Sequence, residues 1–335
     1  MKKGTKQFAA MITLIMLLLP AIIHGQEKLA QTGLQFLDIG LSPRAEAMGG
    51  AFVLAGDNAD ALFYNPAGIA KTSTDYDLTL NRVQWFADIK YNAVGAIYRP
   101  MSGDYGVFGL SFLSGSYGDF YGTRVAAGTS EGYQDMGIFS PTAIAIGLSY
   151  GKQLSDNFSI GGQVKYVKQD LGSNILTAGG PTKDNSVSGF AFDFGMMYST
   201  AIKGFDFGMS IKNFATDFKF EQYSFEAPLT FRVGVSLKVF QLMGVSETGQ
   251  DILVVADAVH PRDSGEHLDL GAEYTFFKLV SLRVGYKVNY SEQGFTAGVG
   301  LNQDLASSMN VRFGYSYGSF GIWNAVHRFS VGMSL

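Results

Sequence analysis

The stretch LSPRAEAMGGAFVLAGDNADALFYNPAGIA, residues 41–70, decides the fold, because it is the one place where the sequence pattern turns helical. It contains residues that cap helix N-termini, prolines that fit a first helical turn, and glycines that end helices. Helices of one or two turns are marginally stable alone in water, so the remaining chain must enclose them. The stretch predicts three such helices, over residues 43–48, 57–63 and 67–70.

Each predicted helix has its own local signal. Ser42–Pro43 and Asn65–Pro66 each place a capping residue before a proline that is tolerated at the first helical position. Asp57 and Asp60 resemble a capping box and predict that the middle helix begins at Asp57. Gly49–Gly50 supplies the backbone freedom that ends the first helix. We call residues 26–74, which contain these helices, the hatch.

Composition limits the class of protein. The 335 residues include 42 Gly, 27 Phe and 17 Tyr but only 16% charged residues, against roughly 25% in an ordinary soluble domain. The net charge of −4 gives no basic footprint, so no nucleic-acid partner is expected. The lack of cysteine excludes disulfides, thiolate metal sites, cysteine nucleophiles and a lipid-modified N-terminal cysteine. The length accommodates two domains or one large β-barrel.

Residues 1–25 have the features of a secretory signal peptide. Three lysines near the N-terminus precede an apolar run over residues 8–23, and Gly25 supplies a small residue for cleavage. The alternative is a single anchoring helix, but the apolar core is short and no later segment reaches the ~18 apolar residues of a membrane helix. The protein is therefore predicted to be exported. The absence of a second apolar helix is compatible with an outer-membrane location, because β-barrels cross membranes with strands.

From Asp75 onward the pattern has a period of two. Over residues 158–166, for example, Phe, Ile, Val and Tyr alternate with Ser, Gly, Gln and Lys. Strict alternation over about ten residues indicates a strand with one apolar face. The predicted strands cover residues 76–86, 90–99, 104–114, 141–151, 157–170, 187–199, 203–215, 227–239, 250–260, 266–277, 279–290, 294–302, 307–317 and 324–335.

The strands predict an all-β fold: a transmembrane antiparallel β-barrel of about 14 strands over residues 75–335, with the short helical hatch in its lumen. A soluble β-sandwich also alternates, but its strands are usually about five or six residues long. The predicted strands are long enough to cross an apolar band of ~25 Å when tilted, and their polar faces are rich in Gly and Ser. We therefore expect a protein of a Gram-negative outer membrane, in contact with outer-membrane lipid.

The lengths of the connections predict an orientation. The long joins, over residues 115–140, 171–186 and 216–226, all fall on one rim of the barrel. Joins on the other rim are short, apart from one of about ten residues over 240–249. Outer-membrane barrels keep short turns on the periplasmic side and long loops outside. We therefore expect both mature termini and the hatch on the periplasmic side.

The sequence does not indicate an enzyme, a cofactor or a metal site. The four histidines lack metal-ligand spacing, and His260 and His267 are explained by solvated positions at strand ends. There is no nucleophile elbow and no phosphate-binding loop. Asp57, Asn58 and Asp60 lack the loop length and distal Glu of a calcium site, so helix capping explains them better.

Charged residues on the polar faces of the strands are predicted to face the lumen. They carry both signs, which favours salt bridges that hold the hatch in place over a selective ion path, for which a ring of one sign is typical. The predicted lumen-facing charges are Lys165, Lys212, Arg232, Lys238, Arg283, Lys287, Arg312, Arg328, Asp193, Asp206, Asp257, Asp269 and Glu273.

Residues 33–70, together with WFADI at 85–89, resemble the N-terminal signature of the PorV/PorQ family, which belongs to the FadL-like outer-membrane proteins. Beyond these residues only the alternation and the number of strands agree. The resemblance implies a 14-stranded barrel with an N-terminal hatch in its lumen. The matching positions are Arg44, Met48, Gly49, Gly50, Ala51, Phe52, Asp57, Asn65, Pro66, Ala67, Gly68, Trp85, Asp88 and Ile89.

The resemblance implies one of two roles. PorV-type proteins act in type IX secretion, where they receive secreted cargo that carries a C-terminal signal domain and hand it to other secretion components. In this role the loops at 115–140 and 171–186 present a docking surface for cargo. FadL-type proteins instead pass hydrophobic small molecules inward through a hatch and a lateral opening.

The sequence leaves both roles open, together with a purely structural one. The NPAG motif at 65–68 occurs in both types and does not separate them. The expected partners are outer-membrane lipid and, according to the role, cargo proteins with secretion components or hydrophobic small molecules. For a channel, the residues expected to line the ligand path are Phe52, Leu62, Phe63, Leu253 and Val255.

Overall fold

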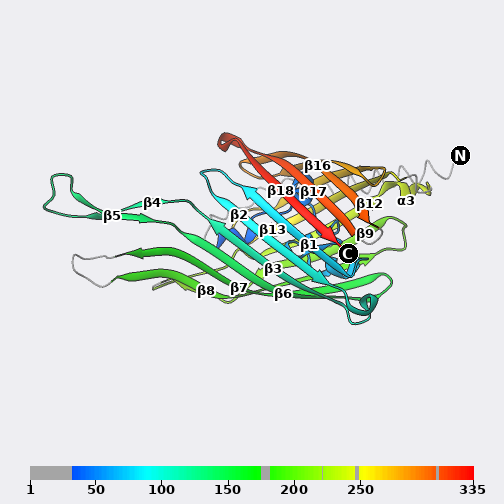
Figure 1. Cartoon of the computed structure of the whole chain (residues 1–335), viewed down its shortest axis with the longest axis horizontal. Coiled ribbons are helices and arrows are strands. Elements are labelled where there is room, and N and C mark those ends of the chain that lie inside the picture. Colours follow the sequence, from blue (N-terminus) through cyan, green and yellow to red (C-terminus); the bar gives the residue numbers. More distant parts are fainter. Residues whose placement is uncertain (1–31, 175–181, 221, 246–248, 307–308) are drawn as a thin grey trace.

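The chain folds into a closed barrel. The structure is a computed structural model that describes residues 32–174, 182–220, 222–245, 249–306 and 309–335. Fourteen of the described strands pair antiparallel in chain order, and the last, β18, pairs with the first, β1, to close the wall (Figure 1). The predicted fold class is therefore confirmed. The predicted signal peptide, residues 1–25, lies outside the described residues.

Each predicted strand has a counterpart in the barrel. The main differences lie at strand ends, and β7 and β8 are longer than predicted because they stay paired beyond the rim. The barrel strands are β1 (Tyr76–Gln84), β2 (Lys90–Tyr98), β3 (Val107–Ser116), β6 (Thr142–Ser155), β7 (Phe158–Asn174), β8 (Lys183–Ser199), β9 (Phe205–Phe214), β12 (Thr230–Lys238), β13 (Asp251–Pro261), β14 (His267–Phe276), β15 (Val280–Val288), β16 (Gln293–Ala306), β17 (Met309–Phe320) and β18 (Ala325–Ser334).

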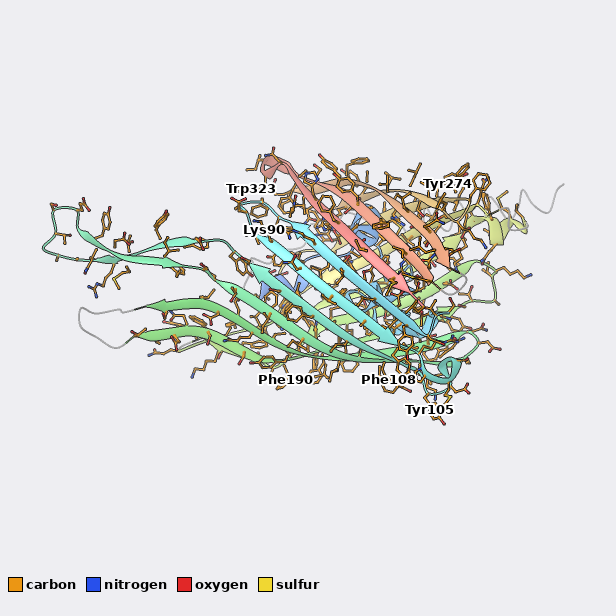
Figure 2. All side chains as sticks on the ribbon, viewed as in Figure 1. Lys90, Tyr105, Phe108, Phe190, Tyr274 and Trp323 are labelled. Carbon is orange, nitrogen blue, oxygen red and sulfur yellow. The ribbon has the colours of Figure 1, made fainter. Side chains whose placement is uncertain are left out.

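The outer face of the barrel wall is apolar and the inner face is polar. On β3, Phe108 and Leu110 point outward and are exposed, as is Phe190 of β8 (Figure 2). On the inner face, charged residues such as Asp257 and Asp269 are buried. This distribution is the reverse of that in a soluble protein and matches a wall that faces lipid. The sandwich alternative is wrong, because one sheet closes on itself.

The described part of the hatch forms four short helices. The three predicted helices correspond to α2, η2 and η3, and the last two are 3-10 helices. None of the described helices combines the length and the apolar character needed to cross a membrane. The hatch helices are η1 (Gln35–Asp38), α2 (Pro43–Ala47), η2 (Ala59–Phe63) and η3 (Pro66–Lys71).

One predicted cap is wrong. The residue that caps η2 is Asn58 and not Asp57, because the Asn58 side chain accepts a hydrogen bond of 3.0 Å from the backbone N–H of Asp60. Asp57 instead forms an ion pair with Arg44. Asparagine and aspartate cap equally well, so sequence spacing alone does not choose between neighbouring candidates.

The hatch spans the lumen and contacts most of the wall. α2 contacts β15 to β18, η2 contacts β1 to β3, and η3 contacts β3, β6, β7 and β8. Between these helices, the backbone of Phe52 and Val53 bonds to β13. The barrel thus supplies the enclosure without which helices of this length are not stable.

The two rims of the barrel differ. At one rim β3 and β6 continue into a separate hairpin, β4–β5, and the C-terminus lies at the opposite end of the barrel (Figure 1). The predicted loop over 216–226 contains a second small hairpin, and the predicted join over 240–249 contains most of a short helix, α3. The remaining elements are β4 (Phe120–Val125), β5 (Tyr133–Phe139), β10 (Phe218–Phe220), β11 (Tyr223–Phe225), α3 (Val239–Met243), η4 (Pro100–Gly103) and η5 (Gly321–Trp323).

Candidate functional site

The helix α2 places Glu46 between two cations of the wall. Its Oε2 lies 3.1 Å from Nζ of Lys287 on β15 and 3.4 Å from Nη2 of Arg328 on β18. Burial alone would raise the pKa of Glu46, but the two cations outweigh burial and lower this pKa to about 2. Glu46 is therefore ionised at neutral pH and joins the hatch to two strands.

Arg44 on the same helix makes a second link to the wall. Its guanidinium donates two hydrogen bonds to Glu273 of β14, from Nη2 at 2.8 Å and from Nε at 3.0 Å. Glu273 also accepts a hydrogen bond from Arg283 of β15, and Arg44 Nη1 lies 3.2 Å from Oδ1 of Asp57. A bidentate bond of this kind fixes orientation as well as distance, so Arg44 sets how α2 lies in the lumen.

Carboxylates of the wall also accept hydrogen bonds from the hatch backbone. Oδ2 of Asp257 on β13 accepts from the N–H groups of Phe52 and Val53, at 2.8 and 3.0 Å. Oδ1 of Asp77 on β1 accepts from the N–H of Ala59 at 2.9 Å. These N–H groups are buried and have no intrahelical partner, so the wall supplies the bonds that the short helices lack.

Further lumen charges pair within the wall. Lys165 lies 2.8 Å from Asp193, and Arg232 lies 2.9 Å from Asp269. Many of the charges that the sequence places on the inner face thus form ion pairs, with one another or with the hatch. This is the arrangement expected of charges that hold a plug rather than of a ring that conducts one kind of ion.

Asn65 and Gly49 hold the hatch backbone at two tight points. The Asn65 amide donates to the carbonyl of Val53 at 2.8 Å and accepts from the N–H of Ala67 at 3.1 Å. Gly49 has a φ of +72°, and a Cβ at this position would lie 2.6 Å from the carbonyl oxygen of Leu270. Of the predicted motif residues, these two therefore have clear local roles in the fold.

The other motif residues are distributed over several places. Gly50 lies close to the side chains of Asp269 and Lys287, and Gly68 lies close to the backbone of Gly56. Met48 is fully buried, and Pro66 begins η3. Trp85 packs on Phe320 with ring centroids 5.1 Å apart, and the Arg328 guanidinium lies 5.7 Å from its ring centroid. Asp88 is exposed in the turn between β1 and β2, which also holds Trp85 and Ile89. The structure thus places one group of motif residues in the hatch and a second group in this turn.

The residues predicted to line an apolar path lie in packed hydrophobic clusters of the lumen. Phe52 lies in one cluster with Leu253 and Val255, whereas Leu62 belongs to a second cluster. Phe63 is half-buried, and the space beside Leu62 and Phe63 has a volume of about 30 Å³. That volume is about the share of one water molecule in the liquid.

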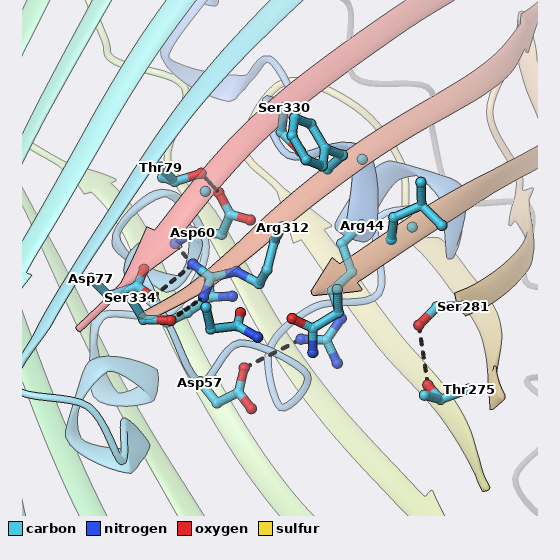
Figure 3. Close-up of a pocket in the computed structure, with 18 of the residues that line it drawn as sticks. Arg44, Asp57, Asp60, Asp77, Thr79, Thr275, Ser281, Arg312, Ser330 and Ser334 are labelled. Atoms are coloured by element: carbon cyan, nitrogen blue, oxygen red, sulfur yellow. Dashed lines mark hydrogen bonds and ion pairs between the residues drawn. The ribbon is translucent and has the colours of Figure 1, made fainter. Parts of the chain in front are cut away.

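The larger internal space is polar and lies near the C-terminal rim. A cavity of about 390 Å³ is lined by Arg44, Asp57, Asp60, Asp77 and Arg312, among others (Figure 3). Its charges are already paired, for example Arg312 with Asp77 at 2.6 Å. Within the described residues, no cluster of three or more possible metal ligands is present. We call this cavity the vestibule. On the hatch side it is lined by residues of α2 and η2 and of the segment between them.

A third feature, at the opposite rim, was not found from the sequence. The β4–β5 hairpin carries strongly exposed apolar side chains, including Tyr121 at 78% and Val125 at 87%. A cleft of about 820 Å³ lies between this hairpin and the extension of β7 and β8. The sequence analysis treats the segment only as a long loop. The aromatic and β-branched residues within 120–125 are the signal that could have identified a strand there.

Comparisons with known proteins agree with the fold. The chain resembles the Ralstonia pickettii toluene transporter TbuX at 13% identity, covering 88% of this chain and 97% of that one with a TM-score of 0.54. It resembles the Pseudomonas putida toluene transporter TodX at 12% identity, with the same coverage and TM-score. A Pseudomonas aeruginosa FadL homologue gives 10% identity, coverage of 88% and 98%, and a TM-score of 0.51. The comparison with curated proteins gave no match.

The family comparison concerns the barrel and the end of the hatch. Residues 61–332 match the family model described as type IX secretion system membrane protein PorP/SprF. The match names PorP/SprF, whereas the sequence signature predicted PorV/PorQ, and most of that signature lies before residue 61. The chain is thus an outer-membrane β-barrel that belongs to the PorP/SprF family of type IX secretion system membrane proteins.

Proposed function

We propose that this protein docks a partner protein during type IX secretion, on the rim that carries the β4–β5 hairpin. The partner is secreted cargo or another component of the secretion system. The observation that carries the proposal is the hairpin itself, whose apolar side chains are exposed beyond the barrel in a protein of a secretion family. Contiguous exposed apolar residues are typical of interaction sites.

The hatch supports a docking role over conduction through the lumen. Glu46, Arg44 and Asp257 join it to β13, β14, β15 and β18 by ion pairs and backbone hydrogen bonds. Moving the hatch would break these ion pairs and leave charges of the wall buried without partners, each at a cost of several kcal/mol. In this proposal the hatch keeps the outer membrane sealed while the partner binds at the rim.

The orientation is part of the proposal. Because short turns lie on the periplasmic side of outer-membrane barrels, the mature termini and the vestibule face the periplasm and the β4–β5 hairpin faces outward. The finer form of the proposal is the PorV-type role, in which cargo with a C-terminal signal domain is received and handed on. The likeness of residues 33–70 to the PorV/PorQ signature supports this form.

A deletion tests the docking role. Residues 119–140 are replaced by a short Gly-Ser linker in the native host, and surface-attached and periplasmic cargo are quantified. We expect cargo to accumulate in the periplasm, while Ile202→Asp in a turn at the other rim leaves secretion unchanged. Heat-modified migration on gels checks that both variants form barrels. Normal surface attachment of cargo after the deletion contradicts the proposal.

The alternative is a channel for uptake of hydrophobic small molecules. It is supported by the fold that the chain shares with the toluene transporters. The space of about 30 Å³ beside Leu62 and Phe63 speaks against it, because a monoaromatic molecule is several times larger. Gentle extraction from outer membranes followed by mass spectrometry separates the roles: a channel retains lipid or another apolar molecule, and a docking protein retains protein.

A further inference from the structure

The exposed hairpin lies outside the apolar band of the wall. On the outward face of β7 the apolar residues end with Tyr166, whose ring packs on Phe190 of β8 with centroids 5.7 Å apart. The next outward residues of β7 are Lys168 and Asp170, which form an ion pair of 3.5 Å. On β8 the next outward residue is the exposed Ser188. The band therefore ends at Tyr166 and Phe190, and contact with lipid tails does not explain exposed apolar groups beyond it.

Two strand edges lack partners beyond this point. The pairing of β6 with β7 ends at Thr142 and Asp170, after which β7 is paired with β8 alone among the described strands. β5 is likewise paired with β4 alone. The two edges meet where a Cβ on Gly172 would lie 3.2 Å from Cδ2 of Phe139. From there the β4–β5 hairpin and the β7–β8 pair extend away from the barrel (Figure 1).

The cleft of about 820 Å³ lies between these two extensions. Consecutive residues of both strands of the hairpin, 121–125 of β4 and 136–139 of β5, line the cleft, so the cleft meets the backbone of the hairpin as well as its side chains. Its apolar lining includes Tyr121, Ile138 and Leu171, and hydroxyl groups come from Thr123 and Ser173. An occupant needs backbone donors and acceptors for the open edges and side chains that alternate between apolar and polar.

We propose that the cleft binds an extended segment of a partner polypeptide, which adds as a strand to the free edge of β5. Strand addition satisfies the open N–H and C=O groups of the edge, and the apolar lining buries alternate side chains of the segment. Burial of these side chains removes apolar surface from water, a gain that the free protein does not have. This inference rests on the proposed docking function and specifies how the partner is held.

A defined peptide tests strand addition in the purified full-length protein. The probe is a fluorescein-labelled octapeptide of alternating Val and Thr with a terminal Lys, and binding is followed by fluorescence anisotropy in detergent. A second peptide carries N-methyl groups at every residue, so it keeps the side chains but loses the backbone N–H groups of both edges. We expect the parent peptide to bind and the methylated peptide to bind at least about tenfold more weakly.

Two matched variants locate the binding site. Leu171 is 40% exposed in the cleft, and Ile202 is 57% exposed at the other rim, so each tolerates Asp without loss of the fold. We expect Leu171→Asp to weaken peptide binding about tenfold and Ile202→Asp to leave it unchanged. Equal binding of both peptides, equal binding by both variants, or no binding of the parent peptide overturns the inference. Displacement of the bound peptide by added lipid A also overturns the inference, because it shows that the cleft binds lipid.

Secretion separates this inference from the proposed function. If deletion of residues 119–140 strands cargo while Leu171→Asp does not, docking at the rim stands and strand addition in the cleft is wrong. If neither change affects cargo, docking itself is wrong. If both strand cargo and the peptide binds as expected, the cleft is the docking site.

Discussion

The carboxylate of Glu46 lies 3.1 Å from the ammonium group of Lys287, and this ion pair joins the hatch to β15 inside the barrel. Arg328 of β18 completes the site at 3.4 Å. Because all three side chains are nearly excluded from water, the pairing determines whether the hatch is held in place.

Replacing Glu46 with Gln tests this link. The substitution removes the carboxylate that pairs with both Lys287 and Arg328 while these cations stay buried, so we expect a loss of about 3–5 kcal/mol in the free energy of unfolding. Urea unfolding in lipid vesicles, followed by tryptophan fluorescence, measures it. The control is Asp57→Asn, whose side chain is 63% exposed and for which a loss of at most about 1 kcal/mol is expected. Equal losses in the two variants would show that burial of the ion pair is unimportant.

The same site predicts a dependence on pH. The pKa of Glu46 is lowered from 4.5 to about 2 in the folded protein, so its contribution to stability is fully present above pH 4.5 and is lost as the pH falls towards 2. We expect the difference in unfolding free energy between the wild type and Glu46→Gln to be constant from pH 5 to 7. It then narrows between pH 4.5 and 2. A difference that stays constant down to pH 2 rules out this titration.

Gly49 predicts an effect of close packing on a left-handed backbone. Gly49→Ala combines a φ of +72° with a Cβ only 2.6 Å from the Leu270 carbonyl oxygen. Gly244→Ala is a matched control, because φ is +67° but nothing lies within 4 Å of its Cβ. The control isolates the cost of the backbone, about 1–2 kcal/mol. We expect the Gly49 variant to lose at least ~1 kcal/mol more in thermal or urea unfolding, and equal losses contradict the contact.

Asn65 predicts a larger loss than an ordinary helix cap. Asn65→Ala removes the bond to the Val53 carbonyl and the cap on Ala67, both of them buried. Asn58→Ala removes one cap bond that is only partly buried. We expect a loss of about 2–3 kcal/mol for the Asn65 variant and about 1 kcal/mol for the Asn58 variant in the same unfolding assay. If Asn58→Ala proves the more damaging, the role of Asn65 as a bridge within the hatch is wrong.

Much of the barrel was predictable because alternation is a local property. A strand such as β3 places Phe108 and Leu110 on one face by backbone geometry alone, so the residues that face lipid can be identified without knowing their neighbours. Two of the hatch helices, α2 and η3, were predictable for a related reason, since Pro43 and Pro66 mark first helical turns locally.

The contacts of the hatch were less predictable. Phe52 meets Leu253 and Val255 in one cluster, and no local pattern relates residues so far apart in the chain. Their approach depends on the register of β13 against its neighbours, where a slip of one residue would turn both side chains to the lipid. Three of the residues predicted to line a channel thus pack in one cluster, and their role in a channel stays a prediction.

The sequence by itself determined that the chain forms a lipid-facing barrel of long alternating strands around short capped helices, because these features depend on periods of two and on capping residues a few positions apart. Only the tertiary structure decided which charges meet, as Glu46 does with Lys287 and Arg328, and that β5 and β7 leave unpaired edges beside a cleft. Such contacts follow from closure and register of the whole sheet, which bring together residues with no local relation in the sequence.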